Sequence, residues 1–372
     1  MARCKKNSRG YLRRTFTYNG KRYEVVAKNE RDLDAKMNKR REEVEKGIEC
    51  VISPTLNAYY ARLTDIRRRE LRGSTLRAQT HQFELMASVK MSSGLLFGDM
   101  LIKDITRRNI EDVRSILLSE GKTPENLNTC FRHLNHVFVC ATEDDTILKN
   151  PCRALKPLRR EKPTINETKH RALSIDETMQ FFKVATERNS FYLNAFELMM
   201  QTGMRIGEIS ALYPFDIDRK KACIHIRRTI SRDEVGAYYV SENAKTSSGI
   251  RDFPLSDKII GIIKNQEKLN NMIFSEDENG LIFKSSEGNI LREYTINREI
   301  KRICEAADLK PFTCHAFRNT FATRFIEQRP QDYKVLSELL GHKDISITLN
   351  LYTHVMNDNK VNAINELNIK TS

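Results

Sequence analysis

The chain has 372 residues, with 63 lysines and arginines against 49 aspartates and glutamates, so that its formal net charge is +14. This length indicates two or three domains, and the basic excess indicates a polyanionic partner, with nucleic acid as the first candidate and an anionic membrane surface as the second. No stretch is long and apolar enough to cross a bilayer, and the first residues lack the apolar core of a signal peptide, so we expect a cytoplasmic protein without a membrane partner. The eight cysteines form no CxxC pair and have no histidine at the usual zinc spacing, which predicts reduced, structural thiols.

Residues 1–48 are predicted to form a small three-stranded sheet followed by one helix. Two stretches rich in aromatic and β-branched residues, 11–18 and 21–27, flank Asn19-Gly20, which is the strongest short hairpin signal, and residues 30–46 have a helical pattern. A basic ribbon of strands can enter a DNA groove and displace phosphate counterions, so we expect a DNA-binding module; a solvated basic sheet without a partner is the alternative. The candidate contacts in this module are Arg13, Arg14, Lys21 and Arg22.

Residues 52–155 are predicted to form an all-helical domain. Ser53-Pro54 resembles a helix start, and helical stretches are expected at 56–71, 75–90, 106–119 and 124–141, separated by breaks that contain glycine. Arginines gather near one connection between helices, where they either contact phosphates or form an ordinary solvated face. The candidate contacts in this cluster are Arg67, Arg68, Arg72 and Arg77.

Residues 156–170 are predicted to be a linker, because prolines punctuate this part of the chain and it is strongly basic. Its arginines include Arg159 and Arg160. Such a segment suits a cationic tether that crosses a duplex about as well as it suits a plain solvated linker.

Residues 171–372 are predicted to form a mixed, mostly helical domain with one small antiparallel sheet. Ser174 and Glu177 have the spacing of a capping box, and residues 191–200 are an apolar helix that should lie in the core. Strands are expected at 223–227, 238–242 and 250–255, the last two joined by a turn at 247–249, and helices at 256–269, 294–307, 314–328 and 332–340. The fold class predicted for the whole chain is therefore mainly α with small β elements (α+β).

The last third of the chain contains a set of side chains that suits the cleavage of a phosphodiester. The set comprises Arg205 in Thr202-Gly203-Met204-Arg205, Lys245 in Lys245-Thr246-Ser247, His315 and Arg318 in His315-Ala316-Phe317-Arg318, His342 in Leu340-Gly341-His342, and Tyr352 in Leu351-Tyr352-Thr353-His354. Arginine, lysine and histidine can neutralise and protonate a phosphate, and a tyrosine can attack it. No cluster of carboxylates accompanies these residues, so we expect chemistry without a metal or other cofactor.

The order and local sequence of these motifs resemble the tyrosine recombinase (phage integrase) family, in particular integrases of conjugative transposons and phages that carry an N-terminal arm-binding domain. The resemblance implies that Tyr352 attacks DNA to form a 3′-phosphotyrosyl link and that strands are exchanged through a Holliday junction. It implies catalytic roles for Arg205, Lys245, His315, Arg318 and His342, and an orienting role for Glu208. Residues 1–48 would then bind arm sites, residues 52–155 would bind the core site, and residues 171–372 would form the catalytic domain with a C-terminal tail.

The implied partners are double-stranded DNA at core and arm sites, three further copies of the chain in a homotetramer on DNA, and an excisionase or a DNA-bending protein. The implied setting is the bacterial cytoplasm, at the nucleoid. Two other functions stay open from the sequence: a Xer-like resolvase of chromosome or plasmid dimers, and a DNA-binding regulator with an inactive recombinase site.

The segment that leads to Tyr352 is ambiguous by its pattern alone. Ile345, Ile347, Leu349 and Leu351 alternate as in a strand, whereas the resemblance implies a short helix, for which Asp344 is a credible cap. We predict the helix. The tail after Tyr352 has an incomplete amphipathic stripe, and we expect it to pack on a neighbouring subunit rather than on its own.

Overall fold

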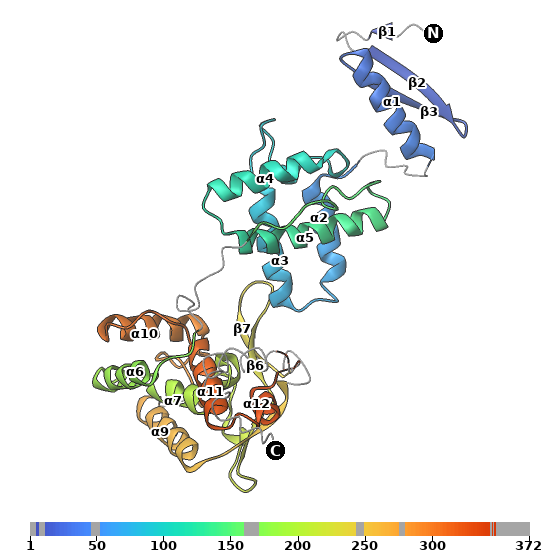
Figure 1. Cartoon of the computed structure of the whole chain (residues 1–372). Helices are drawn as coiled ribbons and strands as arrows, with labels where there is room; N and C mark the ends of the chain where they lie inside the picture. The colour runs from blue at the N-terminus through green and yellow to red at the C-terminus, as the bar shows by residue number, and fades with distance from the viewer. Residues whose placement is uncertain are drawn as a thin grey trace, which may run out of the picture. The chain divides into compact units, whose positions relative to one another are not determined.

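The computed structural model describes residues 5–6, 12–45, 53–159, 171–242, 249–274 and 280–342, together with Asp344 and Ser346 (Figure 1). Lys245, Tyr352, Arg160, the residues that alternate around position 347 and the C-terminal tail lie outside this part of the chain. The chain divides into an N-terminal unit, residues 1–161, and a C-terminal unit, residues 162–372. The described residues are mostly helical with small antiparallel sheets, as predicted, and none of their helices is long and apolar enough to span a membrane.

The N-terminal unit begins with the predicted sheet and helix. The strands β1 (Lys5–Lys6), β2 (Leu12–Tyr18) and β3 (Lys21–Ala27) pair antiparallel in that order, and α1 (Glu30–Glu45) follows. Asn19 and Gly20 have φ values of 45° and 78°, so both central residues of the turn are left-handed, as a two-residue hairpin loop requires. Phe16 packs with Leu33 in the small core between the sheet and α1.

The alternation of side chains along β2 separates the basic residues of this sheet. Arg14 is on the same face as the buried Phe16, and its guanidinium pairs with Asp34 of α1. Arg13 and Arg22 lie on the opposite face, where Arg13 pairs with Glu24 at 2.7 Å. Arg13 and Arg22 therefore lie on the face of the sheet away from α1, whereas Arg14 lies on the face beside it.

The rest of the N-terminal unit is helical, as predicted. Its helices are α2 (Leu56–Arg67), α3 (Gly73–Ala87), α4 (Arg107–Ser119) and α5 (Pro124–Glu143), with the short turns η1 (Phe97–Asp99) and η2 (Ile102–Asp104). The hydroxyl of Thr55 accepts from Ala58 N at 3.2 Å, so Thr55 caps α2 and the predicted start at Ser53-Pro54 is two residues early. Gly73 is the first residue of α3 rather than a break before it.

The helical body extends further along the chain than predicted. Asn128 of α5 donates to Leu158 O at 3.0 Å and accepts from Leu158 N at 2.8 Å, and the Leu155 and Leu158 side chains pack against the core of this unit. These bonds satisfy the backbone of a segment assigned to the linker from the sequence. The chain therefore stays attached to the helical domain through Leu158.

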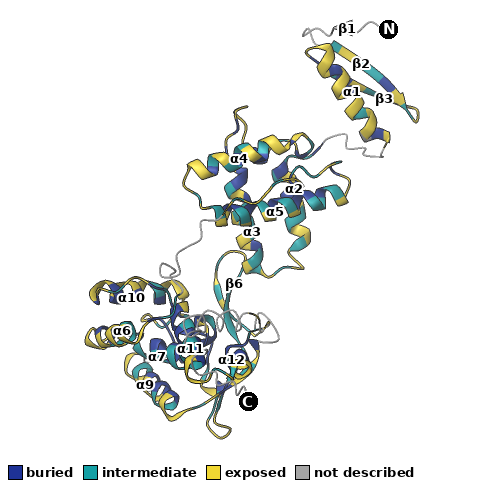
Figure 2. Cartoon of the chain, in the orientation of Figure 1, coloured by how far each residue is buried: buried dark blue, intermediate teal, exposed yellow. Residues whose placement is uncertain are grey.

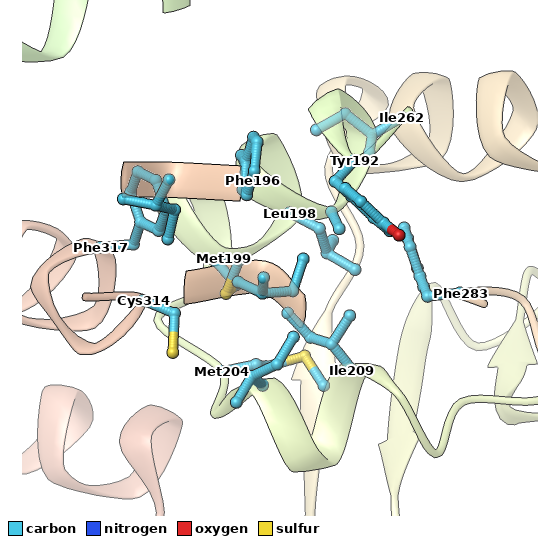
Figure 3. Close-up of a cluster of buried hydrophobic side chains, with 14 of the residues drawn as sticks. Tyr192, Phe196, Leu198, Met199, Met204, Ile209, Ile262, Phe283, Cys314 and Phe317 are labelled. Atoms are coloured by element: carbon cyan, nitrogen blue, oxygen red, sulfur yellow. The ribbon is translucent and has the colours of Figure 1, made fainter. Parts of the chain in front are cut away.

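The C-terminal unit is built around α7 (Leu193–Thr202), whose inner face is fully buried (Figure 2). The helices of this unit are α6 (Ile175–Glu187), α7 (Leu193–Thr202), α8 (Ile206–Ile209), α9 (Asp257–Ile273), α10 (Glu293–Ala306), α11 (His315–Gln328) and α12 (Tyr333–Leu340), with the short turn η4 (Pro214–Asp216). Phe196 and Met199 of α7 lie close to Phe317 of α11 in one hydrophobic core (Figure 3). The predicted capping box at the start of α6 is present, with both Ser174–Glu177 hydrogen bonds formed.

The strands of this unit pair differently from the prediction. The strands β4 (Ile217–Asp218), β5 (Cys223–Ile226) and β8 (Arg251–Pro254) form one sheet in the order β4-β5-β8, whereas β6 (Thr229–Arg232) and β7 (Tyr238–Ser241) form a separate hairpin. The predicted pairing of 238–242 with 250–255, and the single sheet, were therefore wrong. The reason is burial: Ile224 lies directly opposite Phe253, and both side chains fill the core.

Candidate active site

A buried arginine stands at the centre of the candidate site. Arg318 projects from the first turn of α11, and only 8% of its surface is exposed. Its Nη1 donates to Gly203 O at 2.8 Å and its Nη2 donates to Leu340 O at 2.7 Å. These carbonyls lie at the C-terminal ends of α7 and α12, where a helix presents partial negative charge. One guanidinium therefore joins the ends of two helices that are far apart in the sequence.

Each of these helix ends turns through a left-handed glycine. Gly203 has φ 61° and Gly341 has φ 65°, the left-handed conformation in which glycine commonly ends a helix. A Cβ atom at position 203 would lie 2.6 Å from the ring of Phe321, so a side chain there would also force the packed loop to move. The two turns lead directly to Arg205 and His342, so Arg318 braces both segments that carry the other candidate catalytic groups.

Arg205 and Glu208 form an ion pair at the start of α8. Arg205 Nη1 lies 2.9 Å from Glu208 Oε1, and Arg205 N donates to Glu208 Oε2 at 3.0 Å. The Arg205 side chain is 42% exposed, whereas that of Glu208 is 7% exposed. The buried Glu208 carboxylate thus holds one side of the Arg205 guanidinium, and the other side stays accessible to a phosphate. This arrangement fits the orienting role expected for Glu208.

Arg251 is a member of this site that the sequence did not predict. It is the first residue of β8, and its Nη2 and Nη1 donate to the two Glu208 oxygens at 2.8 and 3.2 Å. Its Nε also donates to Leu339 O at 2.6 Å, near the end of α12. Only the local pattern of a strand was visible at this position, and the burial of its guanidinium follows from tertiary packing. Arg251 is therefore a buried bridge between Glu208 and the helix that leads to His342.

The guanidinium groups of Arg205 and Arg251 pair with the Glu208 carboxylate, and the charges of all three groups act on Arg318. Burial alone would raise the pKa of Glu208, but the hydrogen bond and charge of Arg251, together with Arg205, hold that pKa below its usual value. Burial, and then the positive charge of Arg205, lower the pKa of Arg318 to about 9. The site is therefore ready to accept an anion, since it holds more positive than negative charge in a place poor in water.

His342 is half-buried beside the same arginines. Burial, and then the charges of Arg318, Arg205 and Arg251, lower its pKa to about 4. The imidazole is therefore neutral near pH 7 until an anion enters, and it can donate one hydrogen bond to a phosphate oxygen.

Lowering the pH should destabilise the C-terminal unit through His342. The unfolded chain takes up this proton near pH 6.5, whereas the folded chain takes it up near pH 4, so the unfolded state binds more protons in that window. The free energy of unfolding should therefore fall as the pH drops from about 6.5 towards 4. Above this range the ionisation of His342 should contribute no further pH dependence. Urea unfolding of wild type and His342→Gln at several pH values measures this.

A matched control exists in the other unit. The pKa of His133 is also lowered to about 4, chiefly by burial, so His133→Gln should flatten the pH dependence of the N-terminal unit and leave that of the C-terminal unit intact. An unchanged pH slope of the C-terminal unit in His342→Gln would contradict the burial and charge described for this residue.

His315 lies at the start of α11, one turn before Arg318. The residue that caps the helix is Cys314. The His315 side chain is 47% exposed, with its Nδ1 3.9 Å from Glu293 Oε1. The pKa shifts of Glu208, Arg318 and His342 link these three groups with Arg205 and Arg251.

The other predicted DNA contacts occupy surface positions of the N-terminal unit. Arg67 ends α2, Arg72 caps α3, and Arg68, Arg77 and Arg159 are exposed. Arg68 pairs with Asp65 at 3.1 Å, an exposed pair that contributes little to folding. These positions are compatible with phosphate contacts.

The comparison with known proteins identifies the family. Residues 171–359 match the profile described as "Phage integrase family". The chain belongs to this family. It is 32% identical over 289 residues to the "Tyrosine recombinase XerC-like" of Caldanaerobacter subterraneus subsp. tengcongensis, over 73% of each chain, and 25% identical over 261 residues to the ICEBs1 integrase of Bacillus subtilis, over 68% of each. The chain is thus a tyrosine recombinase, an enzyme of site-specific recombination, as its motifs predicted.

Solved structures share the fold of this tyrosine recombinase. The Tn1549 transposon integrase in complex with a circular intermediate DNA has a TM-score of 0.69 at 22% identity, covering 85% of this chain and all of that one. The lambda integrase tetramer bound to a Holliday junction has a TM-score of 0.60 at 19% identity, covering 93% of each chain.

Proposed function

We propose that this recombinase integrates and excises a mobile element by cutting DNA through Tyr352. The observation that carries the proposal is the meeting of Arg205, Arg318 and His342 around the ends of α7 and α12. Guanidinium groups fixed in a dry site stabilise the charge that builds on phosphoryl oxygens in the transition state. The family match and the ICEBs1 integrase relative support the mobile-element reading.

In the proposed reaction the Tyr352 oxygen attacks the scissile phosphorus and the bond to the 5′ oxygen breaks. Lys245 gives a proton to that oxygen, so a 5′-hydroxyl leaves while the 3′ end stays on the enzyme. The hydroxyl then attacks the phosphotyrosine of the partner strand, which conserves the bond energy without ATP. Arg205 and Arg318 neutralise the phosphate, His342 and His315 donate hydrogen bonds, and Glu208 orients Arg205.

The remaining parts are assigned to DNA and to assembly. Residues 1–48 would bind arm sites through Arg13, Lys21 and Arg22, with a smaller part for Arg14. The helical body would bind the core site through its arginine cluster, and the basic segment with Arg159 and Arg160 would cross the duplex. The lambda integrase tetramer on a Holliday junction supports a homotetramer on DNA. In this proposal the tails would be exchanged between neighbouring subunits, and an excisionase or bending protein would set the direction of the reaction.

Dimer resolution is the second candidate function. The name of the XerC-like relative favours it, and that relative is the more similar of the two compared by sequence. The basic N-terminal sheet favours the integrase, because an arm-binding module serves an element with distal sites.

The decisive test is a nicked suicide substrate made from the ends of the chain's own element. Wild type should form a covalent protein–DNA complex in EDTA, and Tyr352→Phe should bind the same DNA without forming it, because phenylalanine has no nucleophilic oxygen. Tyr333→Phe, a tyrosine of α12 outside the motif, is the matched control and should behave as wild type. A covalent complex in Tyr352→Phe would assign the nucleophile to another residue.

A further inference from the structure

The outer face of the β4-β5-β8 sheet carries metal-ligating side chains away from the candidate active site. Successive residues of a strand point to opposite faces. Ile224 and Ile226 of β5 are buried in the core, so Cys223 and His225 lie on the outer face. The register places Asp252 of β8 opposite His225 and Asp218 of β4 opposite Cys223. Three neighbouring strands thus bring a thiol, an imidazole and two carboxylates to one surface.

The ligand atoms of three of these residues are already spaced nearly as they would be around a bound metal ion. His225 Nδ1 lies 2.9 Å from Asp252 Oδ1 and 3.9 Å from Cys223 Sγ. One ligand atom from each of the three residues lies within 4.8 Å of the others. Bonds of about 2.0–2.3 Å in a tetrahedral zinc site hold ligand atoms roughly 3.3–3.8 Å apart. Small side-chain rotations are therefore enough to bind an ion.

Asp218 lies next to Nε2 of His225, the ring nitrogen that does not face Cys223 and Asp252. Its Oδ2 is 3.6 Å from His225 Nε2, while its Oδ1 accepts from Lys220 N at 3.0 Å and Lys221 N at 2.8 Å. Metal-binding histidines usually donate their second N–H to such a carboxylate, which fixes the tautomer and the orientation of the ring. Two backbone amides hold the Asp218 carboxylate in place for this role.

We propose that Cys223, His225 and Asp252 bind one zinc-class divalent cation, with Asp218 orienting His225. A thiolate with an imidazole selects such an ion over magnesium or calcium, and binding releases the thiol proton of Cys223 to solvent. Arg227 Nη2 contacts Asp252 Oδ1 at 2.5 Å, but a carboxylate has two oxygens, so Asp252 can bind the ion through one and Arg227 through the other.

The place of this site in the sheet gives it a structural role. Asp252 directly follows Arg251, and the alternation of the strand sends Arg251 inward to Glu208 while Asp252 points outward. A cation held by β5 and β8 fastens the strand from which Arg251 reaches the active site. The ion itself takes no part in the chemistry on DNA.

Cobalt(II) titration of the metal-free full chain tests the proposal, because cobalt bound to a thiolate has its own absorption band. One Co²⁺ per chain should give this band, and Zn²⁺ should displace it. Cys223→Ser should abolish the band. Asp218→Asn should weaken cobalt binding about 10- to 100-fold, measured in competition with a chromophoric chelator, as expected for a residue that orients a metal ligand through a hydrogen bond.

Two cysteine variants control for other sites. Cys140, whose Sγ lies 3.8 Å from His136 Nε2, belongs to no three-ligand group among the described residues, and Cys314 belongs to a second group with Glu293 and His315. Cys140→Ser and Cys314→Ser should keep the band. Absence of the band in wild type, or its survival in Cys223→Ser with loss in either control, would overturn the proposal. None of these readouts depends on DNA cleavage.

Discussion

Replacing Arg251 by alanine is expected to lower the unfolding free energy of the C-terminal unit by about 3–5 kcal/mol and to abolish DNA cleavage. The Arg251 and Glu208 side chains are only 8% and 7% exposed, so the substitution leaves a buried carboxylate without its main partner. It also removes the donor to Leu339 O near the end of α12. Denaturant unfolding of the full chain, followed by a probe in the C-terminal unit, measures the change.

An exposed ion pair of the same unit is the control for this experiment. Arg219 and Glu267 are 53% and 35% exposed, and Arg219→Ala should cost less than about 1 kcal/mol. Replacing the whole buried pair, as in the double variant Arg251→Met with Glu208→Leu, should recover much of the stability without recovering cleavage. If Arg251→Ala costs no more than Arg219→Ala, the buried bridge does not have the importance assigned to it.

Replacing Arg205 by alanine should slow DNA cleavage strongly but change the stability of the C-terminal unit little. Its side chain is 42% exposed and keeps donors for an incoming phosphate, so its loss should slow cleavage about 10²- to 10³-fold, which is roughly 2.7–4 kcal/mol of transition-state stabilisation. Stability should change far less than in Arg251→Ala, because Glu208 keeps its buried partner. The rate of covalent complex formation at saturating protein isolates this step.

Two variants define what Arg205 contributes. Arg205→Lys keeps the charge but loses the planar pair of donors, and should fall between wild type and alanine. Arg188→Ala removes an exposed arginine at the end of α6 and should cleave at the wild-type rate. A cleavage rate for Arg205→Ala equal to that of Arg188→Ala would remove Arg205 from the catalytic set.

Much of the fold could be predicted because its determinants are local. Asn19-Gly20 can adopt the left-handed turn of a two-residue hairpin, Ser174 and Glu177 cap a helix reciprocally, and Gly341 ends one. Each of these features depends on residues within four positions of one another. They were therefore visible before any tertiary structure.

The features that were missed depend on residues far apart in the chain. Arg251 contacts Glu208 across 43 positions, and nothing near Arg251 in the sequence distinguishes it from a solvated arginine on a strand. The partner of β8 was misassigned because the nearer candidate strand, 238–242, has similar alternation, whereas burial of Ile224 and Phe253 selects β5. The candidate catalytic residues could be proposed from the sequence, but not the bonds that position Arg205, Arg318 and His342.

The bond from Arg318 to Gly203 has a consequence for protein synthesis. The two residues are separated by 115 positions, so a ribosome makes the loop that carries Arg205 long before the side chain that braces it. A nascent or truncated chain that ends before α11 has the first arginine without the support of the second, and it also lacks Tyr352. On the proposed mechanism, an unfinished product of translation can therefore neither organise the phosphate pocket nor cleave DNA.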